Sequence, residues 1–490
     1  MKRLAALAVG LALATAASTQ SPADPAIEGA LMRHIAALSD DAMAGRKPGT
    51  PGADKAVHYI VSQMQAAGLV PGVGGWYQPV DLVERKPTSI RGLWHTDRKR
   101  IAFTSRDFIL LGAQKRLRLD HAPLIFAGYG LEANVEGVDL RGTIVLLLPG
   151  HPANAPDFPT LEVRRAALAN RGAAAVPIIA ASDARWERIR DQYRQGRTLL
   201  AADAGPAAIG IMSDTLWRQL AAGAGHDARQ LETAAAVTGF RALPLAGFVN
   251  LRVKTAIRRY RSVNVVGRID GAQRPGEALL YTAHWDHLGL CRRPAVQDRI
   301  CNGAVDNASG VALMLETARA LAAGPKPGRS ILFVATTAEE MGLLGARSFV
   351  RTPPVPAKSI IAALNLDTVA VAPKGAPVAI IGRGMTALDP LIDATARALG
   401  RKVDSDTDAN SLFSRQDGFA LASGGIPAVM IGGAFSDMAV LESFFASRYH
   451  GPSDDLYHGI ELGGAAEDTV LHIALGRALA DPERFPAPAR

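Results

Sequence analysis

Four stretches of the sequence each place residues that bind metal ions directly after an apolar run. They are ALLYTAHWDH, NGAVDNASG, ILFVATTAEE and AALNLD, and a fifth segment, RYHGPSDD, adds a late histidine. Together they hold two histidines and three carboxylates in an order that can close around two zinc ions, and they leave one further glutamate to act as a base. The pattern predicts a zinc-dependent hydrolase.

The first apolar run is followed by His284 and Asp286. A His-x-Asp spacing in an extended segment points both side chains to the same side of the strand. A zinc-bound imidazole also needs a carboxylate or a carbonyl to orient its second ring nitrogen. We therefore expect Asp286 to orient His284. His287 follows directly and is expected to have a supporting or structural role.

The next candidates are carboxylates at a helix entrance and at a strand end. Asp306 precedes an expected helix, so it is either a helix-capping residue or a carboxylate whose two oxygens bridge two metal ions. Glu339 and Glu340 follow ILFVATTA, where buried carboxylates are costly unless they are paired or bound to metal. Because consecutive side chains point in different directions, one can bind metal while the other faces the reacting water.

The last two candidates are Asp367, which ends the run IIAALNLD, and His450, which lies in a loop rich in turn residues. A single loop histidine is typical of a protein surface, and His458 is interpreted in that way. The coincidence of suitable residues at four strand ends favours a metal site. Nitrogen and oxygen ligands without cysteine are typical of catalytic zinc, although manganese or cobalt could occupy the same ligands.

The elements that must position these residues alternate between strand and helix from Phe248 onward. Strands are expected at VNVVGRI, ALLYTAH, ILFVATT, IIAALNL, PVAIIG and PAVMIGG, and helices at 309–322, 343–350, 388–399 and 467–479. This alternation favours an α/β fold with a mixed, mostly parallel sheet and helices on both faces. Ligands of such sheets bind beyond the carboxyl ends of the strands, where the candidate residues fall.

The length of 490 residues exceeds that of one ordinary core and predicts two folded units. Between residues 97 and 246, short apolar runs are separated by turn residues, with one clear helix at 161–171 and no cluster of metal ligands. We interpret 97–246 as a small β-rich inserted domain. It would divide a catalytic domain into an N-terminal part at 17–96 and a main part at 247–482.

Residues 1–16 have the form of a cleaved secretory signal, with two basic residues, a short apolar run and a small-residue cleavage site. No later segment reaches the length of a membrane span. The mature protein is therefore expected to be periplasmic or secreted, with no membrane anchor. Cys291 and Cys301 are the only cysteines, and we expect either a disulfide across the short loop between them or two isolated thiols.

The net charge of +8 is diluted over a long chain. The basic runs DRKR at 97–100 and RRYR at 258–261 are not interleaved with a recognisable nucleic-acid motif, so we interpret them as solvated surface and expect no nucleic-acid partner. The sequence also lacks a Gly-x-Ser-x-Gly turn and a Walker loop, the signatures of two rival chemistries.

These motifs resemble those of the co-catalytic di-zinc aminopeptidase family, which includes bacterial leucyl aminopeptidases, aminopeptidase S and glutamate carboxypeptidase II. The matching stretches are HWDHLG, NGAVDNASG, EEMGLLGARSF, NLD and YHGPSD, in the family's order. GRKPGTPGADK near the N-terminus resembles the family's opening. The stretches IFAGYGL and DLRGTIVLLLPG resemble a protease-associated domain, an insertion common in larger members.

The resemblance implies the zinc exopeptidase fold and a metal ligand set. His284 and Asp367 would bind one zinc ion, Glu340 and His450 would bind the other, and Asp306 would bridge the two. The implied cofactors are thus two zinc ions, and the implied partner is a peptide substrate.

The resemblance also implies catalytic roles, with Glu339 as the general base and Asp286 orienting the first histidine. The implied activity is removal of N-terminal residues from peptides. Three alternatives stay open: a glutamate carboxypeptidase, for which Arg415 could bind the substrate's carboxylate; a glutaminyl cyclase; and a non-catalytic receptor-like relative. The family's Arg-Ser-Asp-His is replaced here by Arg-Gln-Asp-Gly at 415–418, so the preferred side chain is not implied.

Overall fold

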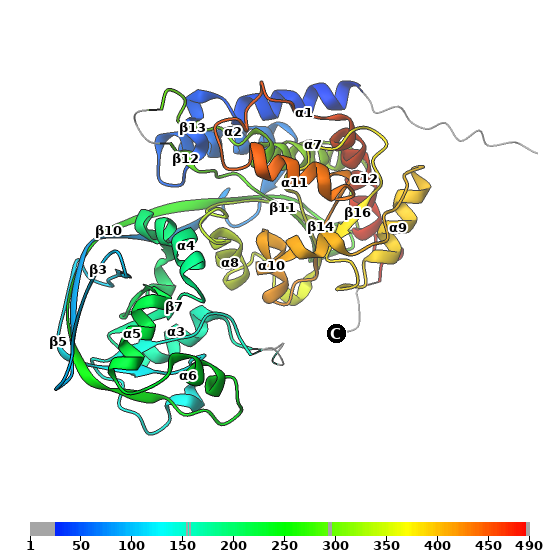
Figure 1. Cartoon of the computed structure of the whole chain (residues 1–490). Coiled ribbons are helices and arrows are strands. Elements are labelled where there is room, and N and C mark those ends of the chain that lie inside the picture. The colour runs from blue at the N-terminus through cyan, green and yellow to red at the C-terminus, as the bar shows by residue number, and fades with distance from the viewer. Residues whose placement is uncertain (1–24, 153–154, 156–157, 293–295, 487–490) are drawn as a thin grey trace, which may run out of the picture. The chain divides into compact units, whose positions relative to one another are not determined.

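The computed structural model describes residues 25–152, 155, 158–292 and 296–486, and it divides the chain into two compact units (Figure 1). One unit combines the chain up to Gln78 with the chain from Asn264 onward, and the other is an insertion from Pro79 to Val263. The insertion is wider than 97–246 because the long strands β2 (Tyr77–His95) and β10 (Leu243–Ile269) each continue from one unit into the other. The expected signal at 1–16 lies outside the described residues.

The first unit is built on a mixed, mostly parallel sheet in the order β16–β17–β15–β11–β14–β10–β1. The four strands from β17 to β14 are parallel, whereas β16, β10 and β1 pair in the antiparallel direction. The predicted fold class is therefore confirmed. The strand bounds are β1 (Val70–Pro71), β11 (Arg274–His284), β14 (Arg329–Thr336), β15 (Ile360–Asn365), β16 (Ala379–Ile381) and β17 (Ala428–Gly432).

Helices cover both faces of this sheet, and its central strands β14 and β15 are buried along their whole length. On one face, Phe349 and Leu421 pack on the strands; on the other, the hydroxyl of Tyr281 donates to the His472 carbonyl over 2.6 Å. The helices of this unit include α1 (Pro25–Leu38), α2 (Pro51–Ala66), α7 (Gly310–Ala322), α8 (Leu344–Arg351), α9 (Asp389–Ala398), α10 (Asp417–Ser423), α11 (Met438–Ser447) and α12 (Gly463–Leu479).

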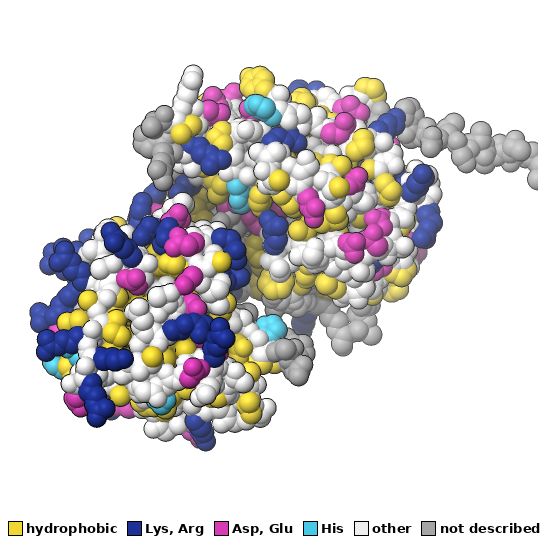
Figure 2. Space-filling model, viewed as in Figure 1, with side chains coloured by type: hydrophobic (Ala, Val, Ile, Leu, Met, Phe, Trp, Pro, Cys, Tyr) yellow, Lys and Arg dark blue, Asp and Glu magenta, His cyan; other side chains and the backbone are white. Residues whose placement is uncertain are grey.

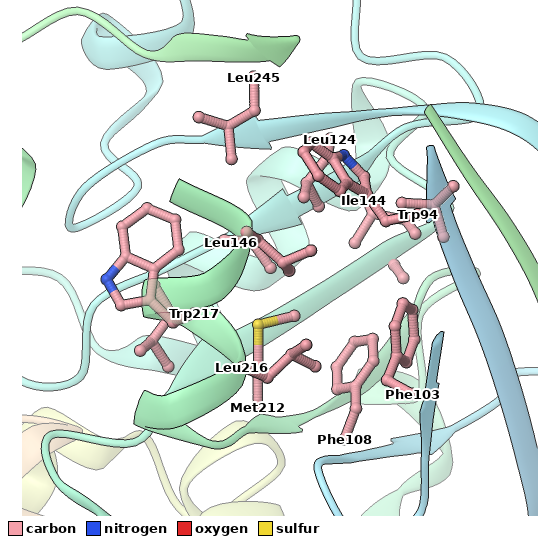
Figure 3. Packing of buried hydrophobic residues seen from close by; sticks show 14 of the residues in the cluster. Trp94, Phe103, Phe108, Leu124, Ile144, Leu146, Met212, Leu216, Trp217 and Leu245 are labelled. Atoms are coloured by element: carbon pink, nitrogen blue, oxygen red, sulfur yellow. The ribbon is translucent and has the colours of Figure 1, made fainter. Parts of the chain in front are cut away.

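The strands of the inserted unit continue the same hydrogen-bonded sheet from β10, in the order β10–β5–β6–β7–β9–β4, and β2 pairs with β10, β3 and β8. Alternate residues enter two apolar cores: Leu124 enters one and Ile125 the other. Figure 3 shows the first core, where Trp94, Phe103 and Trp217 supply large aromatic surfaces. The bounds are β3 (Arg100–Thr104), β4 (Phe108–Leu111), β5 (Arg116–Phe126), β6 (Ile144–Leu146), β7 (Ala175–Ile179), β8 (Arg197–Leu200) and β9 (Ala208–Met212).

The inserted unit also contains helices that the sequence pattern did not reveal. The predicted helix at 161–171 is α3 (Leu161–Asn170), but α4 (Asp183–Gln195), α5 (Asp214–Gly223) and α6 (Ala228–Ala235) join it. In α4, Trp186 is the buried residue, and polar side chains fill most other positions. A helix with so narrow an apolar face shows little periodicity in its sequence.

Of the two alternatives for Cys291 and Cys301, the structure has the disulfide, which closes the hairpin β12 (Gly289–Leu290) to β13 (Ile300–Cys301). Within the described ranges, no helix combines the length and the apolar character needed to cross a bilayer.

Candidate metal centre

Three neighbouring parallel strands deliver the candidate residues to one edge of the sheet. β11 ends at His284, β14 is followed by Glu339 and Glu340, and β15 is followed by Asp367. The strands end at the same level because their register pairs His284 with Thr336 across β11 and β14. Residues that the sequence separates by about eighty positions therefore converge at the carboxyl ends of the strands.

The first group of candidate ligands comprises His284, Asp306 and Asp367, whose ligand atoms all lie within 4.8 Å of one another. The Nε2 atom of His284 is 3.2 Å from Oδ1 of Asp306 and 3.6 Å from Oδ1 of Asp367. These are separations that ligand atoms around one small cation adopt. The three residues are the set that the sequence predicted for the first metal ion together with its bridge.

The second group comprises His287, Asp306 and Glu340. His450 also reaches it, since its Nε2 atom lies 3.3 Å from Oδ2 of Asp306 and 2.9 Å from Oε2 of Glu340. Asp306 thus turns one carboxylate oxygen to each group. His287, for which the sequence predicted a supporting or structural role, places Nδ1 2.6 Å from Oε1 of Glu340, so two histidines face the second position.

Several buried polar atoms at this centre have no hydrogen-bond partner among the described residues, which is a costly arrangement in a protein interior. They include both ring nitrogens of His287, Oδ2 of Asp306, Oε1 of Glu340 and Nε2 of His450. A cation bound between these residues would satisfy Oδ2 of Asp306, Oε1 of Glu340, Nε2 of His450 and one ring nitrogen of His287. The donor set contains nitrogen and oxygen without sulfur, which fits catalytic zinc. The residues present therefore fit a pair of metal ions.

The electrostatics of the centre favour anionic carboxylates. Burial acts to raise the pKa of Asp306, but the imidazoles of His284 and His450 hold it well below its usual range. Burial and the charge of Asp306 act to raise the pKa of Glu340, yet His287 and His450 bring it down to about 2. Both side chains are therefore negative near neutral pH, as cation ligands must be.

Glu339 is in a different environment from the glutamate that follows it. It is buried, and its Oε2 atom lies 4.0 Å from Nε2 of His284. Burial raises its pKa well above the usual range, and the neighbouring carboxylates of Glu340, Asp417 and Asp367 act in the same direction. A carboxyl group with a raised pKa beside a metal-type site has the properties of a general base and acid.

Asp286 is fully buried between the two strand ends and contacts both of them. Its backbone carbonyl, rather than its carboxylate, is the nearer acceptor for Nδ1 of His284, at 3.2 Å against 3.8 Å. The carboxylate accepts a hydrogen bond of 3.1 Å from the backbone N–H of Glu339. Residue 286 therefore contacts the imidazole of one candidate ligand and fixes the backbone of the candidate base.

Arg46 supports the loops of the centre through hydrogen bonds, although no single sequence motif indicated a role for it. It is buried, and its guanidinium donates to the carbonyls of Trp285, Leu38, Asn302 and Gly303 over 2.5 to 3.0 Å. Burial lowers its pKa to about 10 although nearby carboxylates oppose that shift, so it remains charged. The signal for it was the stretch GRKPG within the part that resembles the family's opening.

Asp454 is a second residue that supports these loops, and the sequence motifs did not indicate a role for it. Its carboxylate accepts hydrogen bonds from the backbone N–H groups of Val305, at 2.8 Å, and Asp306, at 3.0 Å. It belongs to the segment YHGPSDD, which also carries His450. The loop of one candidate ligand therefore holds the backbone of another.

The surroundings of His450 explain how a loop histidine is held in place. The ring of Tyr449 stacks on its imidazole with centroids 3.7 Å apart, and Sγ of Cys301 lies 3.4 Å from its backbone carbonyl oxygen. The guanidinium of Arg415 lies over the rings of Phe445 and Tyr449. Arg415 is thus engaged with aromatic rings close to the centre.

Residues 264–473 match the sequence profile described as Peptidase family M28. This part of the chain is a peptidase M28 domain. The domain spans every candidate ligand from His284 to His450 and lies within the unit that carries the parallel sheet. The prediction of a di-zinc aminopeptidase family is confirmed at this level.

Curated relatives match shorter stretches than the M28 domain. A probable zinc metalloprotease of Pyrenophora teres f. teres is 38% identical over 105 residues, which is 21% of this chain and 22% of the relative. A protein named probable lipoprotein aminopeptidase LpqL, from Mycobacterium tuberculosis, is 31% identical over 194 residues, covering 35% of this chain and 36% of its own length. The matches thus span between about a fifth and about a third of these relatives.

A solved structure extends the similarity to nearly the whole chain. The aminopeptidase from Aneurinibacillus sp. strain AM-1 matches 94% of this chain and 96% of its own with a TM-score of 0.57, at 21% sequence identity. At that identity the match shows a shared fold.

Proposed function

We propose that this protein is a zinc-dependent exopeptidase, and specifically an aminopeptidase that removes N-terminal residues from peptides. The observation that carries the proposal is the carboxylate of Asp306, whose two oxygens face two separate groups of ligand atoms. The M28 domain and the shared fold with a solved aminopeptidase support the same assignment.

In this proposal His284 and Asp367 would hold one zinc ion, and Glu340 with His450 would hold the other. Asp306 would contribute one carboxylate oxygen to each, and His287 would add a contact on the side of Glu340. When bound, two zinc ions would polarise the peptide carbonyl, lower the pKa of a reacting water and stabilise the negative charge that develops on the carbonyl oxygen.

The chain's own residues supply the proton transfers. Glu339 takes a proton from the attacking water and later gives it to the nitrogen of the departing amine, so the proton count balances over one turnover. Its backbone is fixed by Asp286, and the buried position excludes competing water from its carboxyl group. Cations beside Glu339 would lower its raised pKa toward the range useful near neutral pH.

The first test is hydrolysis of a panel of aminoacyl-nitroanilides and N-blocked peptides, with added zinc and with chelator. We expect metal-dependent release from free N-termini only. Glu339→Gln should lower kcat by roughly 100-fold to 10,000-fold while zinc content stays unchanged, because it removes proton transfer and leaves the ligands intact. Glu442→Gln, an exposed glutamate on α11, is the matched control and should retain activity.

Activity confined to substrates with a free C-terminal carboxylate would reject the aminopeptidase assignment and favour the carboxypeptidase alternative. One observation favours considering it: Arg415 lies beside the aromatic residues that flank His450. Arg415→Met would separate the two activities, since a carboxypeptidase should lose substrate affinity through a raised KM and an aminopeptidase should not.

We also propose that the protein is exported and that the insertion is a protease-associated domain. The disulfide between Cys291 and Cys301 supports export, because structural disulfides are maintained in oxidising compartments. Mass spectrometry of the mature N-terminus in a periplasmic fraction would test the first point, and an intact N-terminus retained in the cytoplasm would refute it.

A further inference from the structure

The excess positive charge of this chain lies in the inserted unit. Between Pro79 and Val263 there are 27 of the 54 Lys and Arg residues but only 17 of the 46 Asp and Glu residues. The insertion therefore has a formal charge of +10, whereas the rest of the chain has −2. The net charge is concentrated in one unit, contrary to its interpretation as a diluted surface charge.

Four neighbouring strands of the inserted unit carry several of these basic side chains on one face of the sheet. In the order β3–β2–β10–β5, inward side chains such as Trp94, Phe103, Leu251 and Val253 pack in the apolar core. The alternate positions point outward and are exposed. The outward cations, which we call the basic face, are Arg91, Arg100, Arg116, Arg118, Arg252 and Lys254.

Two cross-strand pairs on the basic face bring like charges together. Arg252 is opposite Arg118, and Lys254 is opposite Arg116, in the register of β10 and β5. The first pair shares the carboxylate of Asp120, at 2.6 Å from each guanidinium. The second pair has no acidic partner among the described residues. Like charges directly opposite each other destabilise a sheet, so this pair is unfavourable unless an anion approaches.

The basic run at 97–100 extends the same cationic region. It forms the tight turn between β2 and β3, closed by the backbone N–H of Thr96 donating to the Lys99 carbonyl over 2.9 Å. Exposed side chains of Arg98, Lys99 and Arg100 line a hollow of about 560 Å³ at this turn. In Figure 2, Lys and Arg side chains gather over the part of the inserted unit where Figure 1 labels β3, β5 and β10.

We propose that the basic face docks on the surface of an anionic phospholipid bilayer. A sheet spaces side chains at about 4.8 Å between strands and about 6.8 Å along alternate positions of a strand, which gives a two-dimensional array of charge. Such an array complements a plane of lipid phosphates, and each Lys or Arg near an anionic leaflet contributes to attraction. The hollow at the β2–β3 turn is lined by three cations and one carboxylate, that of Asp97, and the excess of positive charge can receive one headgroup phosphate.

The composition of the basic face argues against single-stranded nucleic acid as its partner. Proteins that bind such strands stack the bases on aromatic side chains. The outward positions of Arg91–His95, Arg100–Thr104, Arg116–Asp120 and Arg252–Lys254 contain no Phe, Tyr or Trp. Phe248, which lines the hollow, already packs against the rings of His95 and His121. Binding of this face to lipid is independent of the proposed peptidase activity, so either can fail without the other.

Co-sedimentation of the full chain with vesicles tests the proposal. The protein should sediment with phosphatidylcholine vesicles that contain about 30 mol% phosphatidylglycerol and not with phosphatidylcholine alone. Binding should weaken as salt is raised from about 50 to about 500 mM, because counterions screen the attraction. Lys254→Glu should weaken partitioning by about tenfold or more.

The same substitution separates loss of binding from loss of folding. Lys254→Glu converts the like-charge pair with Arg116 into an opposite-charge pair, so the midpoint of thermal unfolding should stay the same or rise while vesicle binding falls. The matched control reverses two exposed arginines on helices α4 and α6, Arg188→Glu with Arg229→Glu, and should bind vesicles as the unaltered chain does.

Equal loss of binding in the control would overturn the proposal, since net charge rather than the basic face would then be responsible. Binding to heparin or duplex DNA without binding to anionic vesicles would also overturn it and would identify a different polyanion as the partner. Absence of binding to anionic vesicles at about 50 mM salt would refute the proposal that the basic face docks on a bilayer.

Discussion

Replacing Arg46 with methionine should both destabilise the M28 domain and weaken zinc binding. The guanidinium is 1% exposed and donates to four backbone carbonyls. Methionine fills much of the volume but donates no hydrogen bond. At a minimum of about 1 kcal/mol for each buried acceptor left without a donor, the loss is about 4 kcal/mol or more.

The effect on zinc follows from where those carbonyls lie. Trp285 stands between His284 and Asp286, and Asn302 and Gly303 precede Asp306. Loss of residues that orient metal ligands typically lowers metal affinity by about 10-fold to 100-fold. Arg46→Met should therefore show zinc affinity reduced by that amount in a chelator competition, alongside a lower urea midpoint in the presence of zinc.

Arg164 provides a matched control in the inserted unit. It is 4% exposed and also donates to backbone carbonyls, those of Tyr129, Gly150 and Pro159. Arg164→Met should destabilise the insertion without changing zinc affinity. If Arg46→Met left zinc affinity unchanged, or if Arg164→Met lowered it equally, the reasoning that Arg46 positions the metal ligands would be refuted.

Three further expectations follow from the site and the fold. His450→Ala and His287→Ala should each retain one tightly bound zinc ion, since the group around His284 stays intact. Native mass spectrometry would count the bound ions. Two tightly bound ions in His287→Ala would show that His450 completes the second position without His287. Cys291→Ser with Cys301→Ser should lower the free energy of unfolding by about 2–3 kcal/mol, because the disulfide restricts the unfolded chain; an unchanged urea midpoint would contradict this. Burial lowers the pKa of His472 to about 4, although its hydrogen bond to the Ile431 carbonyl opposes the shift. The imidazole of residue 472 therefore binds a proton more tightly in the unfolded chain than in the folded one. As the pH falls from 6.5 toward 4, the free energy of unfolding should decrease by about 3 kcal/mol relative to its value above pH 6.5. His472→Gln should flatten the stability profile between those values, whereas the exposed His58→Gln should not; equal profiles for both variants would show that His472 is not responsible.

The sequence predicted the catalytic fold well because its strands are buried on both faces. Continuous apolar runs such as ILFVA and IIAAL can satisfy their backbone only inside a sheet, and polar residues directly after them must lie at its carboxyl edge. Asp367 and the adjacent pair Glu339 and Glu340 were identified as candidates for that reason, whereas Asp306 was identified at the entrance of an expected helix.

The helices of the insertion could not be predicted in the same way. In α4, Trp186 supplies the buried surface of a mostly polar helix, so tertiary packing rather than periodicity decides its structure. The first and last residues of the insertion could not be predicted either, because β2 and β10 continue without interruption from one unit into the other.

What the sequence by itself determined was the set of residue types at strand ends, and hence the chemistry of a metal centre with nitrogen and oxygen ligands. The tertiary structure decided which histidines face the second position, which atom of Asp286 lies nearest His284, and that Arg46 holds three loops by their carbonyls. These outcomes depend on contacts between segments far apart in the chain. Local sequence patterns carry information about faces and periods, whereas such contacts are fixed only when the whole core packs.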